Sequence, residues 1–529
     1  MTKLYHIQIS HYFKSPPEME LFSILERLLP IKFIFGEQGL IEVEGAIFIE
    51  GRDKYSANIY SLSLPPPTNS EHKSRQIETL VEFADDPEVP FPFRGRKLST
   101  KLVKAGAVLS LQNNEKVLAT CEQGPIWTVY EIDDVKHYKS ALPLPPISVE
   151  RNFNDVFNGE CFLEILVFLQ FIRAISTDTV YENAPLRASF IIDDPNLHWS
   201  RYGFVDYRAI VAQAQKENYH VSFATIPLDT WFTHAPTADI FRKNSQQLSL
   251  LIHGNNHAKE ELALNYSDQM RKALLIQAIK RIERLEKKAN LRVCRVMVPP
   301  HGACSNKMLA ELPKFGFESA CISTGSLRAH NQNEPWTKTL GFFPSEIIES
   351  CPVLPRWGLT GNVENTLLVA AYLGQPLILR GHHQDLKNGG EVFNEYAKFI
   401  NGLGNVIWSN MTDLSRLNYL WRMEGTKCRV KPLGRSISLV RPSEATEVII
   451  ESPNGIDDCE WQVATVDGFV RKIMPNEHLV LSGEMGSKIF IERHAVPQSP
   501  SVTAENKPTG ATLILRRLLT EVRDRLLVS

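Results

Sequence analysis

The sequence lacks the features that mark an exported or membrane-spanning chain. Residues 1–10 have no positively charged start followed by an apolar core and a small-residue cleavage site, so we expect no signal peptide. The longest apolar run, residues 161–172, is interrupted by Glu164 and Gln170 and is too short to cross a bilayer. These absences predict a cytoplasmic protein without a transmembrane segment.

The chain also lacks paired cysteines and an excess of charge. None of its eight cysteines falls into a CxxC pair, which argues against a structural zinc knot and for reduced thiols. Acidic and basic residues nearly cancel, giving a formal net charge of −2. Bulk electrostatics therefore favours neither a nucleic-acid partner nor an anionic membrane.

A length of 529 residues exceeds one ordinary core and predicts several domains. Residues 1–150 form an N-terminal α/β or β-rich domain, with strands expected at 5–9, 46–50, 107–111 and 116–120 and a helix at 18–29. This domain has no phosphate-binding glycine loop and no nucleophile motif, so the sequence does not indicate its function. Residues 151–186 are expected to form a connecting helix, apolar over 153–175.

A regular alternation of strands and helices follows over residues 187–425. Strands are expected at 188–192, 220–226, 248–252, 295–298 and 319–322, with helices at 206–215, 237–244, 267–288 and 306–314 between them. Such alternation predicts a parallel sheet or a βα-barrel. Functional residues would then lie at the C-terminal ends of the strands.

The last hundred residues have a different pattern. Short strands separated by turns predict a β-sandwich over 426–496. Residues 497–529 read as a linker followed by an amphipathic tail helix, with Leu515, Leu518, Leu519, Val522 and Leu526 at helical spacing and arginines between them. We expect this helix to dock on its own chain or on a neighbouring subunit, in a homo-oligomer; binding to a membrane surface is the alternative.

Chemistry-bearing residues gather at the ends of two expected strands. Asp193 and Asp194 directly follow an apolar strand, an arrangement that is costly unless the carboxylates face a cation or solvent. His253 ends another apolar strand, and His257 follows four residues later, so both imidazoles can share one ion. Two imidazoles and a carboxylate with open positions form a divalent-metal arrangement used by zinc and by non-haem iron.

Two further strand ends carry histidines. Val298-Pro299-Pro300-His301-Gly302 forms a stiff turn that can aim a backbone N–H at a developing oxyanion. Residues 376–381 deliver His382 and His383, and either imidazole can act as a general acid because it titrates near neutral pH. Alternation along the strand favours His383, but a strand that ends at Gly381 leaves both open.

These motifs, in this order, resemble the NodB-homology polysaccharide deacetylases, which form carbohydrate esterase family 4. Asp193-Asp194 looks like the first motif of that family, His253 to His257 like its HxxxH motif, and Pro299 to Gly302 like its third. The resemblance covers roughly residues 188–415 and implies an incomplete (β/α)7 barrel that hydrolyses an acetyl group on a sugar. The implied fold class for the whole chain is α/β, with this deacetylase-type barrel, an N-terminal domain and a C-terminal β-sandwich.

The resemblance also implies a role for each residue. Asp194, His253 and His257 would hold a divalent metal, zinc in most members, with iron, cobalt or nickel as alternatives. Asp193 would be the general base and His382 or His383 the general acid. The backbone near His301 would bind the oxyanion. The partner would be a carbohydrate or a small acylated substrate.

The sequence departs from the family pattern at four places. Val298 stands where the third motif has an arginine that orients the base, and His301 replaces its aromatic residue. Pro195 replaces a glycine, and Pro355-Arg356-Trp357 is the nearest candidate for an Asp–Trp motif. Two other functions follow as alternatives: a weak or inactive barrel that serves as a binding or assembly module in polysaccharide metabolism, and a non-sugar C–N hydrolase.

Overall fold

The structure is a computed structural model, and the chain divides into two compact units that are treated separately. Unit 1 comprises residues 1–181, 335–342 and 364–373, and unit 2 comprises 182–334, 343–363 and 374–529. The structure describes residues 3–35, 42–49, 58–66, 76–103, 108–145, 147–148, 150–361, 363–451, 461–466, 469–473, 479–482, 488–494 and 510–526.

Unit 1 is built on a nine-stranded mixed sheet in the order β2-β1-β3-β4-β9-β8-β7-β5-β6. Its strands are β1 (Tyr5–Ile9), β2 (Ile31–Phe35), β3 (Gly45–Ile49), β4 (Tyr60–Leu64), β5 (Gln76–Phe83), β6 (Lys97–Val103), β7 (Lys116–Cys121), β8 (Gly124–Ile132) and β9 (Val135–Ser140). Its helices are α1 (Pro16–Leu28), α2 (Leu163–Ile175) and α8 (Glu364–Tyr372). The expected mixture of helix and strand is present in this unit.

Two expectations for unit 1 are wrong. Residues 108–111 are not a strand, because β7 already pairs with β5 on one side and β8 on the other and has no free edge. The expected helix over 153–175 begins only at Leu163, after a 3₁₀ turn at Phe153–Asp155.

Unit 2 contains a curved, almost wholly parallel sheet in the order β18-β19-β17-β16-β15-β14-β11-β21-β20, with β22 beside β11. The strands are β11 (Arg187–Asp193), β14 (Val221–Thr225), β15 (Leu248–Ile252), β16 (Val293–Met297), β17 (Ser319–Cys321), β18 (Glu346–Ile348), β19 (Cys351–Leu354), β20 (Trp357–Gly358), β21 (Leu377–Gly381) and β22 (Ile407–Trp408). The sheet forms a half-barrel, and the expected parallel α/β arrangement is confirmed.

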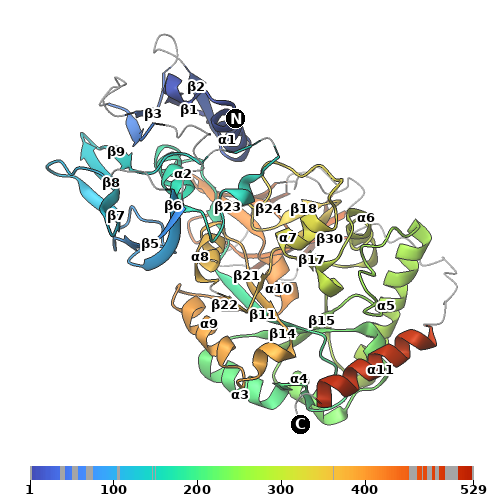
Figure 1. Cartoon of the computed structure of the whole chain (residues 1–529). Helices are drawn as coiled ribbons and strands as arrows, with labels where there is room; N and C mark the ends of the chain where they lie inside the picture. Colours follow the sequence, from blue (N-terminus) through green and yellow to red (C-terminus); the bar gives the residue numbers. More distant parts are fainter. Residues whose placement is uncertain are drawn as a thin grey trace. The chain divides into compact units, whose positions relative to one another are not determined.

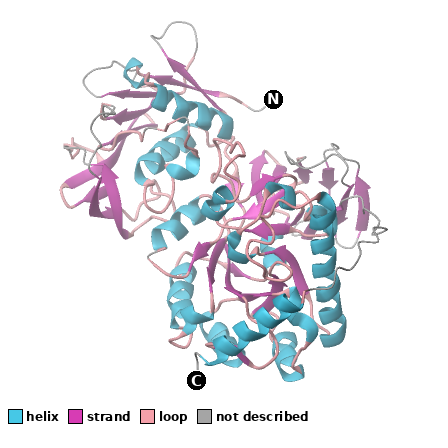
Figure 2. Ribbon diagram, turned by 45° about the vertical axis from the view of Figure 1, so that its right-hand side comes forward, coloured by secondary structure: helices cyan, strands magenta, loops and turns pink. Residues whose placement is uncertain are grey.

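Helices pack around this sheet, most of them on its outer side (Figure 1, Figure 2). They are α3 (Tyr207–Glu217), α4 (Ala235–Lys243), α5 (Asp268–Ala289), α6 (Asn306–Leu309), α7 (Thr324–Ala329), α9 (Glu391–Asn401) and α10 (Met411–Arg416). The expected helix at 306–314 is broken into α6 and a 3₁₀ turn, because Pro313 has no N–H to continue it. Met411 and Leu414 of α10 join Ile191, Leu251 and Ile378 of the sheet in one buried core.

The C-terminal strands of unit 2 form two further sheets, in the orders β10-β23-β24-β26-β29 and β25-β30-β27-β28. They consist of β10 (Glu182–Asn183), β23 (Tyr419–Glu424), β24 (Lys427–Pro432), β25 (Ser436–Val440), β26 (Glu447–Ile450), β27 (Trp461–Val466), β28 (Phe469–Ile473), β29 (Leu479–Ser482) and β30 (Lys488–His494). Val430, Val448, Ile437 and Ile491 belong to one apolar cluster, so the two sheets share a core.

The last described element is α11 (Ala511–Leu526), an amphipathic helix as expected; the expected linker before it lies outside the described residues except for Gly510. Among the described residues, no helix combines the length and apolarity needed to cross a bilayer. The seven described cysteines are free thiols, as the sequence predicts. A short hairpin, β12 (Arg201–Tyr202) and β13 (Val205–Asp206), follows β11 and lies near the site described next.

Candidate metal centre

Parallel pairing brings the expected strand ends to one rim of the half-barrel. β11 ends at Asp193, and its neighbour but one, β15, ends at Ile252, directly before His253. β14 lies between them, with Asp193 paired to Ala224 and Thr225 paired to Ile252. Because the three strands run in the same direction, the residues that follow β11 and β15 meet on the same side of the sheet.

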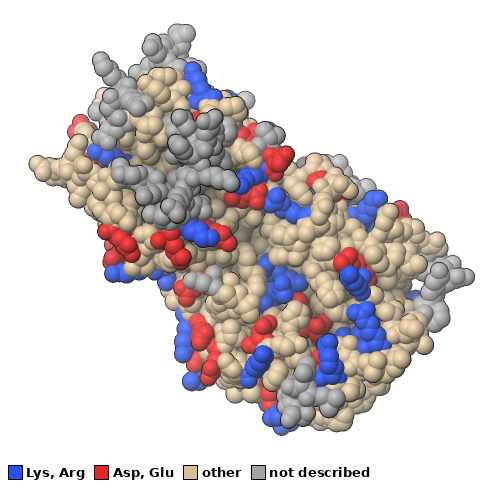
Figure 3. All heavy atoms as spheres, viewed as in Figure 1, with Lys and Arg blue, Asp and Glu red and all other residues tan. Residues whose placement is uncertain are grey.

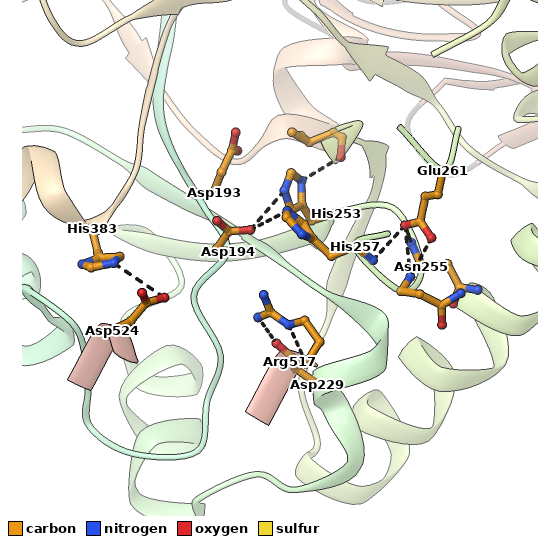
Figure 4. Close-up of polar contacts among 12 residues, drawn as sticks. Asp193, Asp194, Asp229, His253, Asn255, His257, Glu261, His383, Arg517 and Asp524 are labelled. Carbon is orange, nitrogen blue, oxygen red and sulfur yellow. Dashed lines mark hydrogen bonds and ion pairs between the residues drawn. The ribbon is translucent and has the colours of Figure 1, made fainter. Parts of the chain in front are cut away.

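Asp194, His253 and His257 converge there on a single point. Asp194 Oδ1 lies 3.4 Å from His253 Nε2 and 3.0 Å from His257 Nε2. One ligand atom from each of the three residues lies within 4.8 Å of the others. Figure 4 shows the carboxylate and both imidazoles pointing toward one another.

The hydrogen bonds around His253 test whether this cluster suits a cation. His253 Nδ1 lies 2.8 Å from the carbonyl oxygen of Val298, so Nδ1 must carry a proton. In the neutral imidazole Nε2 then presents a lone pair toward Asp194 Oδ1, which is also an acceptor. Two acceptors facing each other in a buried site are stabilised by a positive charge between them. A divalent metal satisfies this requirement, and a backbone carbonyl that fixes the tautomer is the usual outer partner of a metal-binding histidine.

The backbone of Asp194 turns its carboxylate toward the imidazoles. Asp194 has a φ of 81°, in the left-handed region that residues with a Cβ seldom adopt. Its N–H still donates to the carbonyl of Ala224, at 3.2 Å, so the turn begins directly at the end of the sheet. Burial raises the pKa of Asp194, but His253 and His257 outweigh burial and hold that pKa well below its ordinary value. The carboxylate is therefore ionised at neutral pH.

Asp193 is held by a different partner. Arg356, in the turn between β19 and β20, donates from Nη1 to both carboxylate oxygens of Asp193 at 3.1 Å. Asp193 and Arg356 are each 3% exposed, so this is a buried ion pair. Burial raises the pKa of Asp193, but Arg356, His253 and His382 together outweigh burial and lower that pKa below its ordinary value. Asp193 is thus a buried, ionised carboxylate beside the metal cluster.

A buried glutamate organises the loop that carries both histidines. Glu261 accepts hydrogen bonds from the N–H groups of Asn255 at 2.7 Å and of Asn256 and His257 at 3.0 Å. It is 1% exposed, and Figure 4 shows it on the side of the loop away from Asp194. His257 itself has a φ of 54°. The glutamate therefore holds His257 in a strained backbone conformation.

The two candidate acids differ in their surroundings. β21 ends at Gly381, so both histidines lie beyond the strand. His383 is 2% exposed and packs against the rings of Tyr202 and Phe204, at centroid distances of 5.5 and 6.0 Å. Burial lowers its pKa. His382 is half-buried, and its N–H donates to Asp385 at 2.8 Å.

His301 lies beside the cluster and is exposed, in a turn whose other residues are buried. Its ring centroid is 5.1 Å from that of His257, and its φ is 58°. Burial and the neighbouring His257 lower its pKa. The N–H groups of Gly302 and Ala303 donate to the carbonyls of Pro299 and Pro300, so the turn is fixed and these two donors are already used.

Helix α11 lies over the cluster. Arg517 forms a buried ion pair with Asp229, with an Nη2–Oδ2 distance of 2.5 Å. Glu521 lies 3.1 Å from Nδ1 of His198, whose Nε2 lies 2.8 Å from the carbonyl of Asp229. Because both ring nitrogens face acceptors, His198 carries two protons here. Burial lowers the pKa of His198, but Glu521 and Asp229 raise it above its ordinary value.

The end of α11 reaches the candidate acid. Asp524 accepts a hydrogen bond from the hydroxyl of Tyr202 at 3.0 Å and lies 3.8 Å from His383 Nε2. Its other carboxylate oxygen accepts from Nη2 of the neighbouring Arg523 at 2.7 Å. Arg517 also interacts electrostatically with Asp194. Figure 4 shows Arg517 and Asp524 of α11 on the same side of Asp194 and His257.

Sequence reasoning missed Glu261 and the acidic residues of α11, and it named Arg356 and the arginines of the tail helix without their contacts to the site. The spacing His253, His257, Glu261 repeats a step of four, a signal that could have drawn attention to Glu261. Arg356 follows the apolar strand β19, as the other site residues follow theirs. No local signal connects α11 to a site more than 250 residues earlier in the chain.

The curved α/β half-barrel thus brings two carboxylates and two histidines together at one rim. No protein-family model matches the sequence, and the search of curated proteins finds no relative. Among solved structures, Agd3, described as a novel carbohydrate deacetylase, matches with a TM-score of 0.50 and 10% identity, over 93% of this chain and 99% of Agd3. The chain therefore has a carbohydrate deacetylase fold, which confirms the resemblance found in the motifs.

Two other solved structures align with under half of the chain. A family 4 carbohydrate esterase from Streptomyces lividans matches with a TM-score of 0.28 and 12% identity, over 43% of this chain and 93% of the esterase. A family 4 pseudoenzyme from Bacillus anthracis matches with a TM-score of 0.28 and 12% identity, over 45% of this chain and 68% of the pseudoenzyme.

Proposed function

We propose that the chain is a metal-dependent hydrolase that removes an acetyl or similar acyl group from a carbohydrate or a related substrate. The observation that carries this proposal is the convergence of Asp194 Oδ1 with the Nε2 atoms of His253 and His257, at 3.0–3.4 Å. The donor set, one carboxylate and two imidazoles, suits zinc and also iron, cobalt or nickel. The predicted (β/α)7 barrel would present this set at its rim.

Asp193 is the proposed general base. When bound, a divalent cation makes water acidic enough to lose a proton near neutral pH and polarises a carbonyl group. Asp193 lies beside the ligand set, is ionised, and can accept that proton. Arg356 fixes the carboxylate through both oxygens, which takes over the orienting task that the missing arginine before Pro299 would have had.

His383 is the preferred general acid, with His382 retained as the second candidate. His383 is buried next to Tyr202 and its pKa is lowered, so it is neutral at rest and must gain a proton before it can donate one to a leaving group. The turn at His301 is the proposed oxyanion-facing element.

The first experiment measures the metal content of the purified chain and of four variants. Asp194→Asn, His253→Ala and His257→Ala should each lose most of the metal, because each removes one of three ligands. His330→Ala is the matched control, since His330 also bonds to a backbone carbonyl, at 2.8 Å, but lies outside the cluster. Stoichiometric metal in all three ligand variants would rule out the site.

The second experiment measures acetate release from a panel of acetylated sugars and of non-sugar N-acyl compounds. The wild-type chain should release acetate from sugars, and Asp193→Asn should lower the rate at least a hundredfold. Equal activity in Asp193→Asn would show that Asp193 is not the base. Release only from the non-sugar compounds would identify the chain as the alternative C–N hydrolase.

The position of α11 favours one competing function, a binding module without turnover. Arg517, Glu521 and Asp524 of α11 pair with Asp229, His198 and Tyr202 near the ligand set, and a binding module would keep the helix in this position permanently. Full metal content combined with no hydrolysis by the wild-type chain, and none by a chain lacking residues 497–529, would support the binding module.

A further inference from the structure

Helix α11 is docked with its polar side inward. Arg517 and Asp524 are 8% and 3% exposed, and the side chain of Glu521 is 13% exposed. All three are paired with residues of the half-barrel, as described above. This is the reverse of the usual arrangement, in which a surface helix buries its apolar stripe and exposes its charges.

The apolar stripe of α11 therefore faces outward. Ile514, Leu515, Leu518, Leu519 and Val522 are 45%, 58%, 43%, 61% and 52% exposed. Their spacing places all five on one side of a helix that is about 24 Å long. A contiguous exposed stripe of this kind marks an interaction surface rather than ordinary surface variation.

The charges at the edges of this stripe are positive. Arg516 and Arg523 are exposed, whereas both acidic residues of the helix, Glu521 and Asp524, face inward, and Arg523 is also ion-paired with Asp524. In Figure 3 the surface where α11 lies in Figure 1 is mostly uncharged, with Lys and Arg side chains beside it. The outward face of α11 is thus apolar and cationic, although the net charge of the whole chain is −2.

Exposed aromatic residues continue the surface next to α11. Trp231 and Phe232 are 61% and 39% exposed, and their rings lie 5.1 and 5.8 Å from the ring of His198, which binds Glu521 of α11. Trp199, the neighbour of His198, is 52% exposed. Tryptophan and phenylalanine beside an apolar, arginine-edged helix are the composition of surfaces that lie in the interface of an anionic bilayer.

A second copy of the chain fits this stripe less well. None of the exposed residues that the structure describes in α11 is acidic, so the stripe of a second α11 offers Arg516 no opposite charge. Five half-exposed side chains also provide much less than the roughly 800 Å² per partner that a stable dimer uses.

We propose that the outward face of α11, with the adjoining Trp199, Trp231 and Phe232, binds an anionic lipid surface. Ile514 to Val522 would enter the boundary between headgroups and acyl chains. Arg516 and Arg523 would lie at the level of the lipid phosphates. Residues on the polar side of the helix stay on the half-barrel, so binding does not depend on the hydrolase activity proposed above.

Co-sedimentation of the full chain with lipid vesicles tests this proposal. Phosphatidylcholine vesicles with and without phosphatidylglycerol are compared at low and at raised salt. The wild-type chain should bind the vesicles that contain phosphatidylglycerol, and raised salt should weaken that binding. The variant Leu515→Glu/Leu519→Glu should bind at least tenfold less, and Arg516→Gln about fivefold less.

Val440→Glu is the matched control, because Val440 in β25 is 61% exposed, like Leu519, and lies away from α11. It should bind as the wild type does. Absence of vesicle binding by the wild type, or unchanged binding by the double Leu variant, would overturn the proposal. A concentration-dependent dimer in sedimentation velocity that the double Leu variant abolishes, without vesicle binding, would instead assign the stripe to a second copy.

Discussion

Substitution of Glu261 by glutamine isolates the contribution of the loop to metal binding. Among the three proposed ligands, Glu261 contacts only His257, and it does so through the backbone N–H of His257 and not through the imidazole. Its carboxylate accepts three N–H bonds in a loop whose residue His257 has a φ of 54°. Glutamine has nearly the same shape, but it carries no charge and presents an NH₂ group where an acceptor is needed.

The expected loss of loop stability follows from the hydrogen bonds to Glu261 that are lost. A hydrogen bond to a charged group contributes about 1.5–3 kcal/mol, and glutamine can keep part of the set through its remaining oxygen. We therefore expect the loop to lose roughly 2–4 kcal/mol of stabilisation. Outer partners of metal ligands typically change metal affinity by about 10- to 100-fold when they are removed. Glu261→Gln should weaken metal binding within that range.

Competition with a chromophoric chelator measures the affinity for Zn²⁺ directly and needs no substrate. Glu260→Gln is the control, because Glu260 carries the same charge one residue earlier and accepts none of the three N–H bonds. The control should bind Zn²⁺ as tightly as the wild type. Equal affinities for Glu261→Gln and Glu260→Gln would refute the idea that Glu261 preorganises the ligand loop.

Substitutions at three other positions test two ion pairs near the site and a buried histidine, His220, at the opposite end of the sheet. Arg356→Met leaves the Asp193 carboxylate buried without its partner and should lower the free energy of unfolding, measured in urea, by about 3 kcal/mol. Arg356→Lys should recover part of this stability. An unchanged free energy of unfolding in Arg356→Met would exclude the buried ion pair. Arg517→Ala breaks the buried pair that holds α11, a cost of roughly 3–5 kcal/mol, and should speed removal of metal by a chelator relative to Arg516→Ala. Burial lowers the pKa of His220 to about 4, so the folded chain resists its protonation while the unfolded chain binds a proton near pH 6.5. Stability should fall by about 2–3 kcal/mol between pH 7 and 4.5, and His220→Gln should show less of this loss in urea unfolding; an identical loss in both proteins would contradict the assignment.

The half-barrel was predictable because its signal is local. Each parallel strand is a short apolar run followed by polar residues, so the runs before Asp193 and His253 identified both the strands and their C-terminal ends. Parallel pairing then makes those ends meet, whatever the details of the register. The same logic explains why Asp194, His253 and His257 could be grouped from the sequence alone.

The residues that were missed depend on pairings that no local pattern encodes. Arg356 reaches Asp193 across 163 positions, and Arg517 reaches Asp229 across 288. α11 was recognised as an amphipathic helix, and amphipathicity alone would have turned its leucines inward. The buried partners Asp229 and His198 reverse that orientation, because they pair with Arg517 and Glu521 and so hold the polar side of α11 against the half-barrel. Buried charges stabilise a docked helix only when each is paired in good geometry.

Adjacent carboxylates can take separate tasks here because the backbone changes direction between them. Asp193 is the last residue of β11 and follows the alternation of the strand, which directs it to Arg356. Asp194 leaves the strand with a φ of 81°, which swings its carboxylate to the two imidazoles instead. If both residues kept extended backbone geometry, their side chains would point to opposite faces of the sheet, and only one could reach the site. Pro195 follows at once, and because the residue before a proline favours extended geometry, Asp194 keeps its φ of 81° against that preference. The proline that replaces the glycine of the related motif is therefore compatible with the site, because the unusual backbone conformation is carried by the metal ligand itself.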